Sequence, residues 1–126
     1  MVHILSFDIG TRRTGVAFGD TSNGVVVSLD TILHQSKDEL IEEAVKIAQE
    51  KSVTEVVVGL PKLPSGDEGE QAAFSRSVGV AFSALGWHVT YLDERFTTSK
   101  DGSFDGDAKA AIELLQLAFQ KGIDKL

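Results

Sequence analysis

A nearly continuous apolar run from Val53 to Leu60 (VTEVVVGL) constrains the fold more than any other feature of this chain. A short Val-rich run of this kind, ended by Pro61, is typical of a strand buried on both faces of a sheet. Amphipathic helical patterns precede and follow it, at about residues 37–51 and after Ser65. Because long helical crossovers join parallel strands, these patterns predict an α/β domain with helices packed on its sheet.

Further strands are predicted by alternating apolar residues. The expected strands are residues 3–8, 14–19, 25–32 and 87–92, and the expected last helix has an apolar stripe from Ala108 to Phe119. The order is therefore βββαβαβα, a mixed five-stranded sheet with three helices. The first three strands form an antiparallel meander, and the last two run parallel to the first. We expect capping boxes at Ser36–Glu39 and Ser65–Glu68 to start the first two helices.

The composition of the chain excludes several classes of protein. The 126 residues suit a single domain spanning residues 1–126, and the lack of cysteine excludes disulfides, Cys-ligated metals and thiol catalysis. No segment approaches the ~20 apolar residues of a membrane helix, so we expect a cytoplasmic protein that does not bind membranes. With a net charge of −7, the chain needs a local basic patch or bridging cations to bind a polyanion such as nucleic acid.

Acidic residues gather where the predicted strands end. Asp8 closes the first strand and Asp93-Glu94-Arg95 closes the strand 87–92, so parallel strands would place both at one sheet edge. Asp105 and Asp107 stand at the start of the last helix, where each alone is explained by helix capping. Converging carboxylates bind hard cations, and two Mg²⁺ or Mn²⁺ ions support in-line hydrolysis of a phosphodiester. The alternative for Asp8 alone is ordinary turn chemistry.

Basic and hydroxyl residues are expected at the same edge. The basic residues in loops predicted there are Arg12, Arg13, Lys62, Arg95 and Lys100. Thr97 and Thr98 add hydroxyl donors, and together these groups suit phosphate binding. Arg12 and Arg13 are equally explained by a polar turn.

Four segments of the chain form a recognisable set. They are 8–17 (DIGTRRTGVA) with Asp20, 58–61 (VGLP) with 66–69 (GDEG) and Ala72, 93–98 (DERFTT), and Asp107 with 110–112 (AAI) and 115–116 (LQ). In this order they resemble the motifs of the YqgF/RuvX family of Holliday-junction-resolvase-like nucleases, which have an RNase H-like fold. Ser65 stands where the family usually has Asp. The resemblance covers most of the chain.

The resemblance implies a metal-dependent nuclease that processes the 5′ end of pre-16S ribosomal RNA, or alternatively resolves branched DNA such as Holliday junctions. It implies that Asp8, Glu94 and Asp107 bind Mg²⁺ or Mn²⁺, with Asp8 bridging two ions. Asp93 is the family's neighbouring acid, and Arg13 and Arg95 would contact phosphates. We expect a monomer or a homodimer.

One departure from the family concerns the segment before the last helix. Only Ser99 to Gly106 separate the DERFTT motif from Asp107, where the family usually has a further helical stretch and a Lys/Arg-rich loop. This shortening favours a second hypothesis, a non-catalytic nucleic-acid-binding or ribosome-assembly module. A third is a nucleotide-binding domain of the actin and sugar-kinase type, suggested by residues 8–11 (DIGT), although such proteins need two domains of this kind to enclose ATP.

Overall fold

The computed structural model describes residues 2–93 and 104–121, with the backbone alone for 104–107. Its elements are β1 (His3–Ile9), β2 (Arg13–Asp20), β3 (Val26–Leu33), α1 (Lys37–Lys51), β4 (Glu55–Leu60), α2 (Glu70–Ala84), β5 (His88–Asp93) and α3 (Phe104–Gln120). The predicted order of elements is confirmed, and each expected strand boundary lies within two residues of the observed one.

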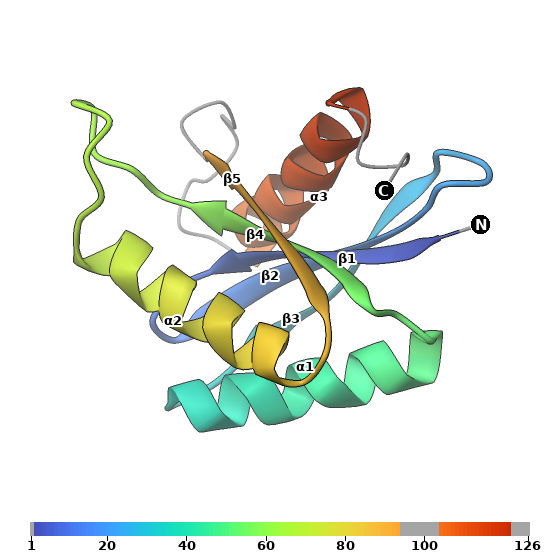
Figure 1. Cartoon of the computed structure of the whole chain (residues 1–126), viewed down its shortest axis with the longest axis horizontal. Coiled ribbons are helices and arrows are strands. Elements are labelled where there is room, and N and C mark those ends of the chain that lie inside the picture. The colour runs from blue at the N-terminus through green and yellow to red at the C-terminus, as the bar shows by residue number, and fades with distance from the viewer. Residues whose placement is uncertain (1, 94–103, 122–126) are drawn as a thin grey trace.

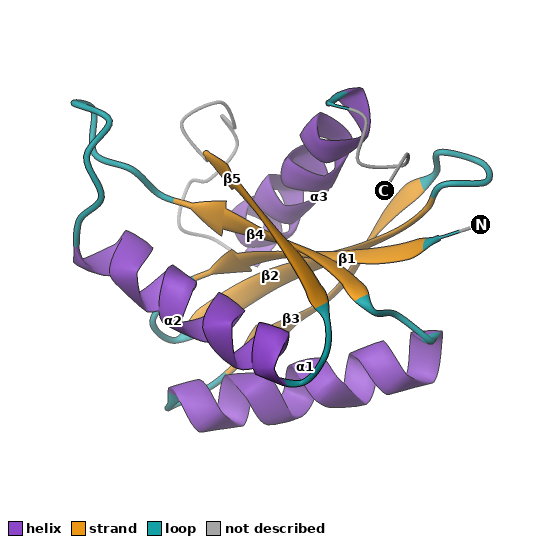
Figure 2. Cartoon of the chain, viewed as in Figure 1, coloured by secondary structure: helices purple, strands orange, loops and turns teal. Residues whose placement is uncertain are grey.

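The strands form one sheet in the order β3-β2-β1-β4-β5 (Figure 2). β1 pairs antiparallel with β2 and β2 with β3, whereas β4 is parallel to both β1 and β5. The mixed sheet expected from the sequence is therefore confirmed. Because β1, β4 and β5 all point the same way, their carboxyl ends share one edge of the sheet.

Helices cover both faces of the sheet, with α1 and α2 on one side and α3 on the other (Figure 1). β1 lies in the middle, and its side chains alternate between the two layers. Leu5, Phe7 and Ile9 belong to the apolar core formed with α1 and α2, and Ile4 belongs to the core formed with α3. By the same alternation Ser6 and Asp8 face α3.

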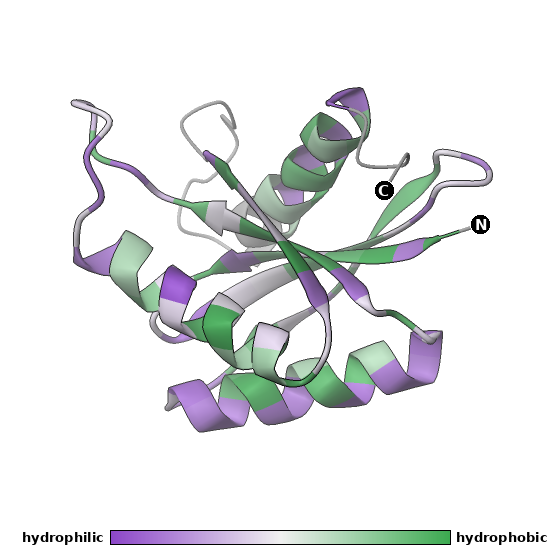
Figure 3. Cartoon of the chain, viewed as in Figure 1, coloured by the Kyte–Doolittle hydropathy of each residue, from purple (hydrophilic) through white to green (hydrophobic). Residues whose placement is uncertain are grey.

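The first helix begins as predicted, at Lys37. The Ser36 hydroxyl oxygen accepts a hydrogen bond from the Glu39 N–H at 3.2 Å, while the Glu39 carboxylate accepts one from the Gln35 N–H. The helix then presents an apolar stripe to the sheet and polar residues outward (Figure 3).

The second predicted capping box is wrong. Helix α2 starts at Glu70, with Gly69 at its N-cap and no side-chain cap. The Ser65 hydroxyl instead contacts Asp67 twice, accepting from its N–H at 3.3 Å and donating to its carboxylate at 3.2 Å. Because these groups satisfy each other inside the loop, the helix begins further along the chain.

None of the helices in the described part of the chain has both the length and the apolar character needed to cross a membrane.

Candidate functional site

Asp8 lies near the carboxyl end of the central strand and is completely buried. The chain then turns sharply, because the Gly10 N–H donates to the Arg13 carbonyl oxygen at 2.9 Å. A Cβ on Gly10 would lie 2.5 Å from that same oxygen, so only glycine fits this turn. The tight turn brings Arg12 and Arg13 close to the strand end that carries Asp8.

Gln71, in the first turn of α2, forms a hydrogen bond with the end of β1. Its side-chain amide donates to the Ile9 carbonyl oxygen at 2.8 Å. The residue directly after Asp8 is therefore tied to α2 and cannot shift without breaking this bond. Sequence analysis missed Gln71, since nothing local indicates a contact between residues 62 positions apart.

Asp93 ends β5 at the same edge of the sheet. Leu60 of β4 pairs with Asp93, and Phe7 pairs with Val58, so Asp93 lies one residue beyond the level of Asp8. β4 separates their strands, which places β1 and β5 about 10 Å apart. Tyr91 packs with the α1/α2 core and Leu92 with the α3 core, so alternation assigns Asp93 to the face opposite Asp8.

Helix α3 is fastened to β1 by a buried hydrogen bond. The Ser6 hydroxyl donates to the Ala111 carbonyl oxygen at 2.7 Å. Further along the helix, Phe119 and Leu115 lie against Gly19, which pairs with Ile4 at the opposite end of β1. Helix α3 therefore runs antiparallel to β1, and its N-terminal turn, including position 107, lies toward the carboxyl edge.

Basic residues surround the turn after β1. Arg12 is exposed and its guanidinium donates to the Gln35 side-chain oxygen. A pocket of about 410 Å³ opens beside it, lined by Arg12, Arg13, Leu33, His34, Gln35 and Glu39. Below the pocket, the buried His34 Nε2 lies 2.9 Å from the Thr14 hydroxyl, and burial lowers the pKa of His34.

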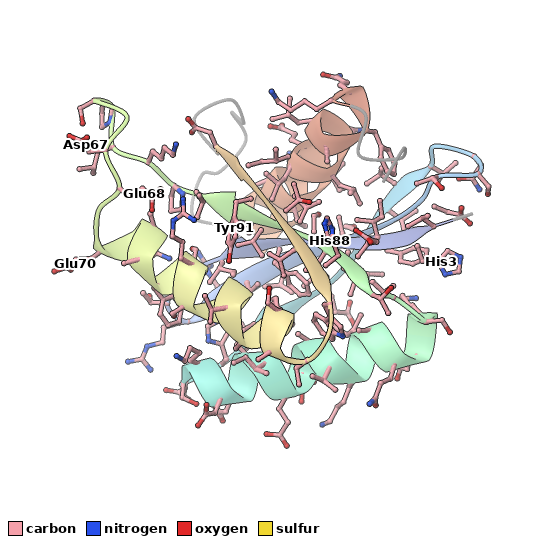
Figure 4. The ribbon with its side chains drawn as sticks, viewed as in Figure 1. His3, Asp67, Glu68, Glu70, His88 and Tyr91 are labelled. Carbon is pink, nitrogen blue, oxygen red and sulfur yellow. The ribbon has the colours of Figure 1, made fainter. Side chains whose placement is uncertain are left out.

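The loop after β4 carries Lys62 and is anchored to α2. Glu68 makes a two-pronged ion pair with Arg76, with contacts of 2.6 and 2.7 Å, and this hydrogen bonding lowers the pKa of Glu68. The Arg76 guanidinium also lies 5.0 Å from the centre of the Tyr91 ring. Figure 4 labels Glu68 on the loop before α2 and Tyr91 on β5. Sequence analysis missed this anchor, although Glu68 and Arg76 stand eight residues apart.

The structure brings some of the predicted site residues together at one edge and leaves others undescribed. Asp8, Arg12, Arg13 and Lys62 occupy the strand ends and loops of the carboxyl edge. Glu94, Arg95, Thr97 and Thr98 lie outside the described residues, and of Asp107 only the backbone position is given. Within residues 2–93 and 108–121, no group of three His, Asp or Glu side chains could hold a metal ion.

Comparisons with known proteins agree with this arrangement. Over 96 residues the chain is 38% identical to a Chloroflexus aurantiacus protein named "Putative pre-16S rRNA nuclease", covering 75% of this chain and 63% of that protein. A Ralstonia pickettii protein of the same name is 32% identical over 124 residues, which are 94% of this chain and 87% of that protein. Thermus thermophilus RuvC, solved with a Holliday junction substrate, has a TM-score of 0.63 at 8% identity over 97% of both chains.

The sheet order, the helices on its two faces and the likeness to RuvC define an RNase H-like domain with an acidic residue at the end of its central strand. The chain belongs to the RuvX family, described as Holliday junction resolvase, whose sequence model matches residues 2–111.

Proposed function

We propose that this protein hydrolyses phosphodiester bonds in structured nucleic acid, with the 5′ region of pre-16S ribosomal RNA as substrate and Mg²⁺ or Mn²⁺ as cofactor. One observation carries the proposal. Asp8 is fully buried at the end of the central strand and faces α3, whose N-terminal turn is directed to the same edge. The names of the relatives from Chloroflexus aurantiacus and Ralstonia pickettii support the choice of substrate.

The residue types assigned to this edge suit a divalent cation. A carboxyl group with no exposed surface, such as that of Asp8, is costly to bury unless hydrogen bonds or cations stabilise it. Carboxylate oxygens are also the ligands that Mg²⁺ prefers. We assign Asp8, Glu94 and Asp107 to hold the metal.

Helix geometry favours Asp107 over Asp105 as the third carboxylate. Ala111 contacts Ser6 on the Asp8 face of β1. Position 107 is four residues before Ala111, which rotates it by only about 40° around the helix, whereas position 105 is rotated by about 120°. The backbone position of residue 107 therefore lies on the stripe of α3 that meets β1.

Strand alternation favours Glu94 over Asp93. Leu92 packs with the α3 core and Asp93 follows it on the opposite face. Alternation therefore counts against Asp93 as a partner of Asp8, and the proposal assigns Glu94, its neighbour in the DERFTT motif, to the metal instead.

Two cations held there would neutralise charge on the attacking and leaving oxygens of an in-line displacement. The protein's own contribution is to fix the carboxylates on one face and to orient the substrate backbone. Arg12, Arg13, Lys62, Arg95, Thr97 and Thr98 are proposed to bind phosphates along this edge. Cationic side chains placed along this edge would attract phosphates despite the net charge of −7, because phosphate binding responds to nearby cationic groups.

Cleavage of end-labelled RNA tests the proposal. The purified protein is incubated with a precursor 16S 5′ fragment, and separately with a four-way DNA junction, in EDTA, Mg²⁺ or Mn²⁺. We expect metal-dependent cuts in the RNA that disappear in Asp8→Asn. Asp30→Asn, the same change at an exposed position on the edge strand β3, is the matched control and should cleave like the unmodified protein.

Each other outcome has a definite meaning. Cuts confined to the DNA junction would replace ribosomal RNA by branched DNA as the substrate. Cleavage by Asp8→Asn at the unmodified rate would refute the site. Binding of RNA without any cuts in either metal would identify a binding module in place of an enzyme.

A further inference from the structure

The contact between Ser6 and Ala111 joins two groups in the middle of an apolar layer. Both residues are buried, with 0% exposure for Ser6 and Ala111. The surrounding side chains of this layer are aliphatic, among them Ile4, Ala17 and Val57 from the sheet. Apolar packing is non-directional, so it holds α3 against the sheet without selecting one axial position strongly. A hydrogen bond of 2.7 Å does select one.

The bond lies close to the proposed metal site on both of the elements it joins. Asp8 follows Ser6 by two residues on the same face, which is about 7 Å along a strand. Position 107 precedes Ala111 by four residues, which is about 6 Å along a helix. Because α3 runs antiparallel to β1, Asp8 lies beyond Ser6 toward the carboxyl edge, and position 107 lies beyond Ala111 in the same direction. The backbone positions of residues 8 and 107 are therefore at about the same level along β1.

We propose that Ser6 is a positioning residue, whose hydroxyl sets the axial register of α3 on β1 so that position 107 lies level with Asp8. This proposal rests on the function proposed above and deepens it. Ser6 does not touch metal or substrate. Its hydroxyl determines how well two carboxylates carried by different elements fit one pair of cations.

Removing the hydroxyl should leave the protein folded. The Ala111 carbonyl has two lone pairs and lies inside α3, so it keeps its helical hydrogen bond when the Ser6 hydroxyl is absent. Ser6→Ala therefore leaves no buried acceptor without a partner. The helix remains packed by its apolar face, but its axial position is less narrowly defined.

The structure offers a matched control in Ser75. This serine is also completely buried, but it lies on α2, on the other side of the sheet, and its hydroxyl has no hydrogen-bond partner among the described residues. Ser75→Ala removes the same atom from an equally buried place without loosening α3. Val78→Ala, a core truncation on α2, supplies a destabilised variant whose α3 contact is intact.

The test is Mn²⁺ binding measured by electron paramagnetic resonance, which does not depend on cleavage. Outer residues that orient metal ligands typically change metal affinity by 10- to 100-fold, and we expect Ser6→Ala to weaken Mn²⁺ binding by about tenfold. Ser75→Ala and Val78→Ala should bind like the unmodified protein at a temperature where all variants are folded. Asp8→Asn should weaken binding more than Ser6→Ala.

The outcomes separate this inference from the proposed function. If Asp8→Asn weakens Mn²⁺ binding and Ser6→Ala does not, the positioning role is wrong and the metal site stands. If Val78→Ala weakens binding as much as Ser6→Ala does, the effect is general loss of stability and the positioning role is again wrong. If Asp8→Asn leaves Mn²⁺ binding unchanged, the metal site itself is refuted, and the role of Ser6 with it.

Discussion

Gly79 of α2 packs directly against the ring of Tyr91 in β5. A Cβ on Gly79 would lie 2.3 Å from the Tyr91 hydroxyl oxygen and within 2.8 Å of two ring carbons. Gly79 therefore allows α2 to approach β5 more closely than any other residue would. The Tyr91 ring also contacts the guanidinium of Arg76. Arg76 in turn pairs with Glu68 of the loop that carries Lys62, so the packing of Gly79 on Tyr91 also supports this loop.

The close approach of Gly79 to Tyr91 predicts whether alanine at position 79 raises or lowers the free energy of unfolding. Alanine at a helix interior is normally more favourable than glycine by about 1 kcal/mol. Here overpacking costs about 1–3 kcal/mol, because a Tyr ring moves less easily than a flexible chain end, so Gly79→Ala should lower the free energy of unfolding. In a Tyr91→Val background the same change should raise it. Urea denaturation of the four proteins measures both signs, and a stabilising Gly79→Ala in the unmodified protein would contradict the prediction.

The turn after Asp8 should be more sensitive in function than in stability. Gly10→Ala forces the chain away from the Arg13 carbonyl and should reduce cleavage strongly, at a stability cost of about 1–3 kcal/mol. Gly24→Ala is a suitable control. Gly24 has φ +70°, with nothing within 4 Å of its Cβ position, so alanine there costs stability through backbone strain, in a hairpin at the other end of the sheet. Equal losses of cleavage in the two variants, measured at matched fractions folded, would show that Gly10 has no special role.

Burial of His34 predicts a dependence of stability on pH. Desolvation lowers the pKa of His34 below its ordinary value of 6.5, so in the interval just below pH 6.5 the unfolded chain binds more protons than the folded protein. The stability that the neutral His34 side chain contributes to the folded protein is fully present above about pH 6.5. It is lost as the pH falls through the pKa of His34 in the folded protein. His34→Gln should remove this part of the pH dependence while keeping a polar partner for Thr14. The urea midpoints of both proteins between about pH 5 and 8 test this, and parallel profiles would argue against it.

Salt dependence tests whether Lys62 contacts a phosphate. A residue that neutralises one phosphate contributes about 0.7–0.9 to the slope of log affinity against log salt concentration. Lys62→Ala should therefore reduce the slope for RNA binding by nearly one. Lys46→Ala removes an exposed lysine of α1 that pairs with Glu43, and its slope should not change. Equal slopes for both variants would remove Lys62 from the proposed nucleic-acid surface.

Much of the fold could be predicted because it depends on local patterns. Val53 to Leu60 and the two flanking amphipathic segments determine the parallel strands, and Ser36 with Glu39 determines where α1 begins. The start of α2 was mispredicted because Ser65 has two possible hydrogen-bonding partners nearby, and the loop partner Asp67 is the one it contacts.

The candidate site could be predicted only in part, for a physical reason. Residue type and strand position indicate Asp8. The groups that support it are defined by contacts across the fold, such as Ser6 with Ala111, 105 residues apart, and Gln71 with Ile9. These contacts depend on how α3 and α2 pack on the sheet, and no local sequence pattern predicts that packing.

The alternation along β1 gives the protein two surfaces that can be engineered separately. Leu5 and Phe7 can be repacked against α1 and α2 to raise the melting temperature, and the site face keeps its shape because the change is made on the other side of the sheet. Ile4, on the opposite face, packs with α3, so a volume change there should shift this helix relative to Asp8. Thermostable variants should therefore be sought by changing odd-numbered positions of β1, and variants that test the proposed metal site by changing the even-numbered ones.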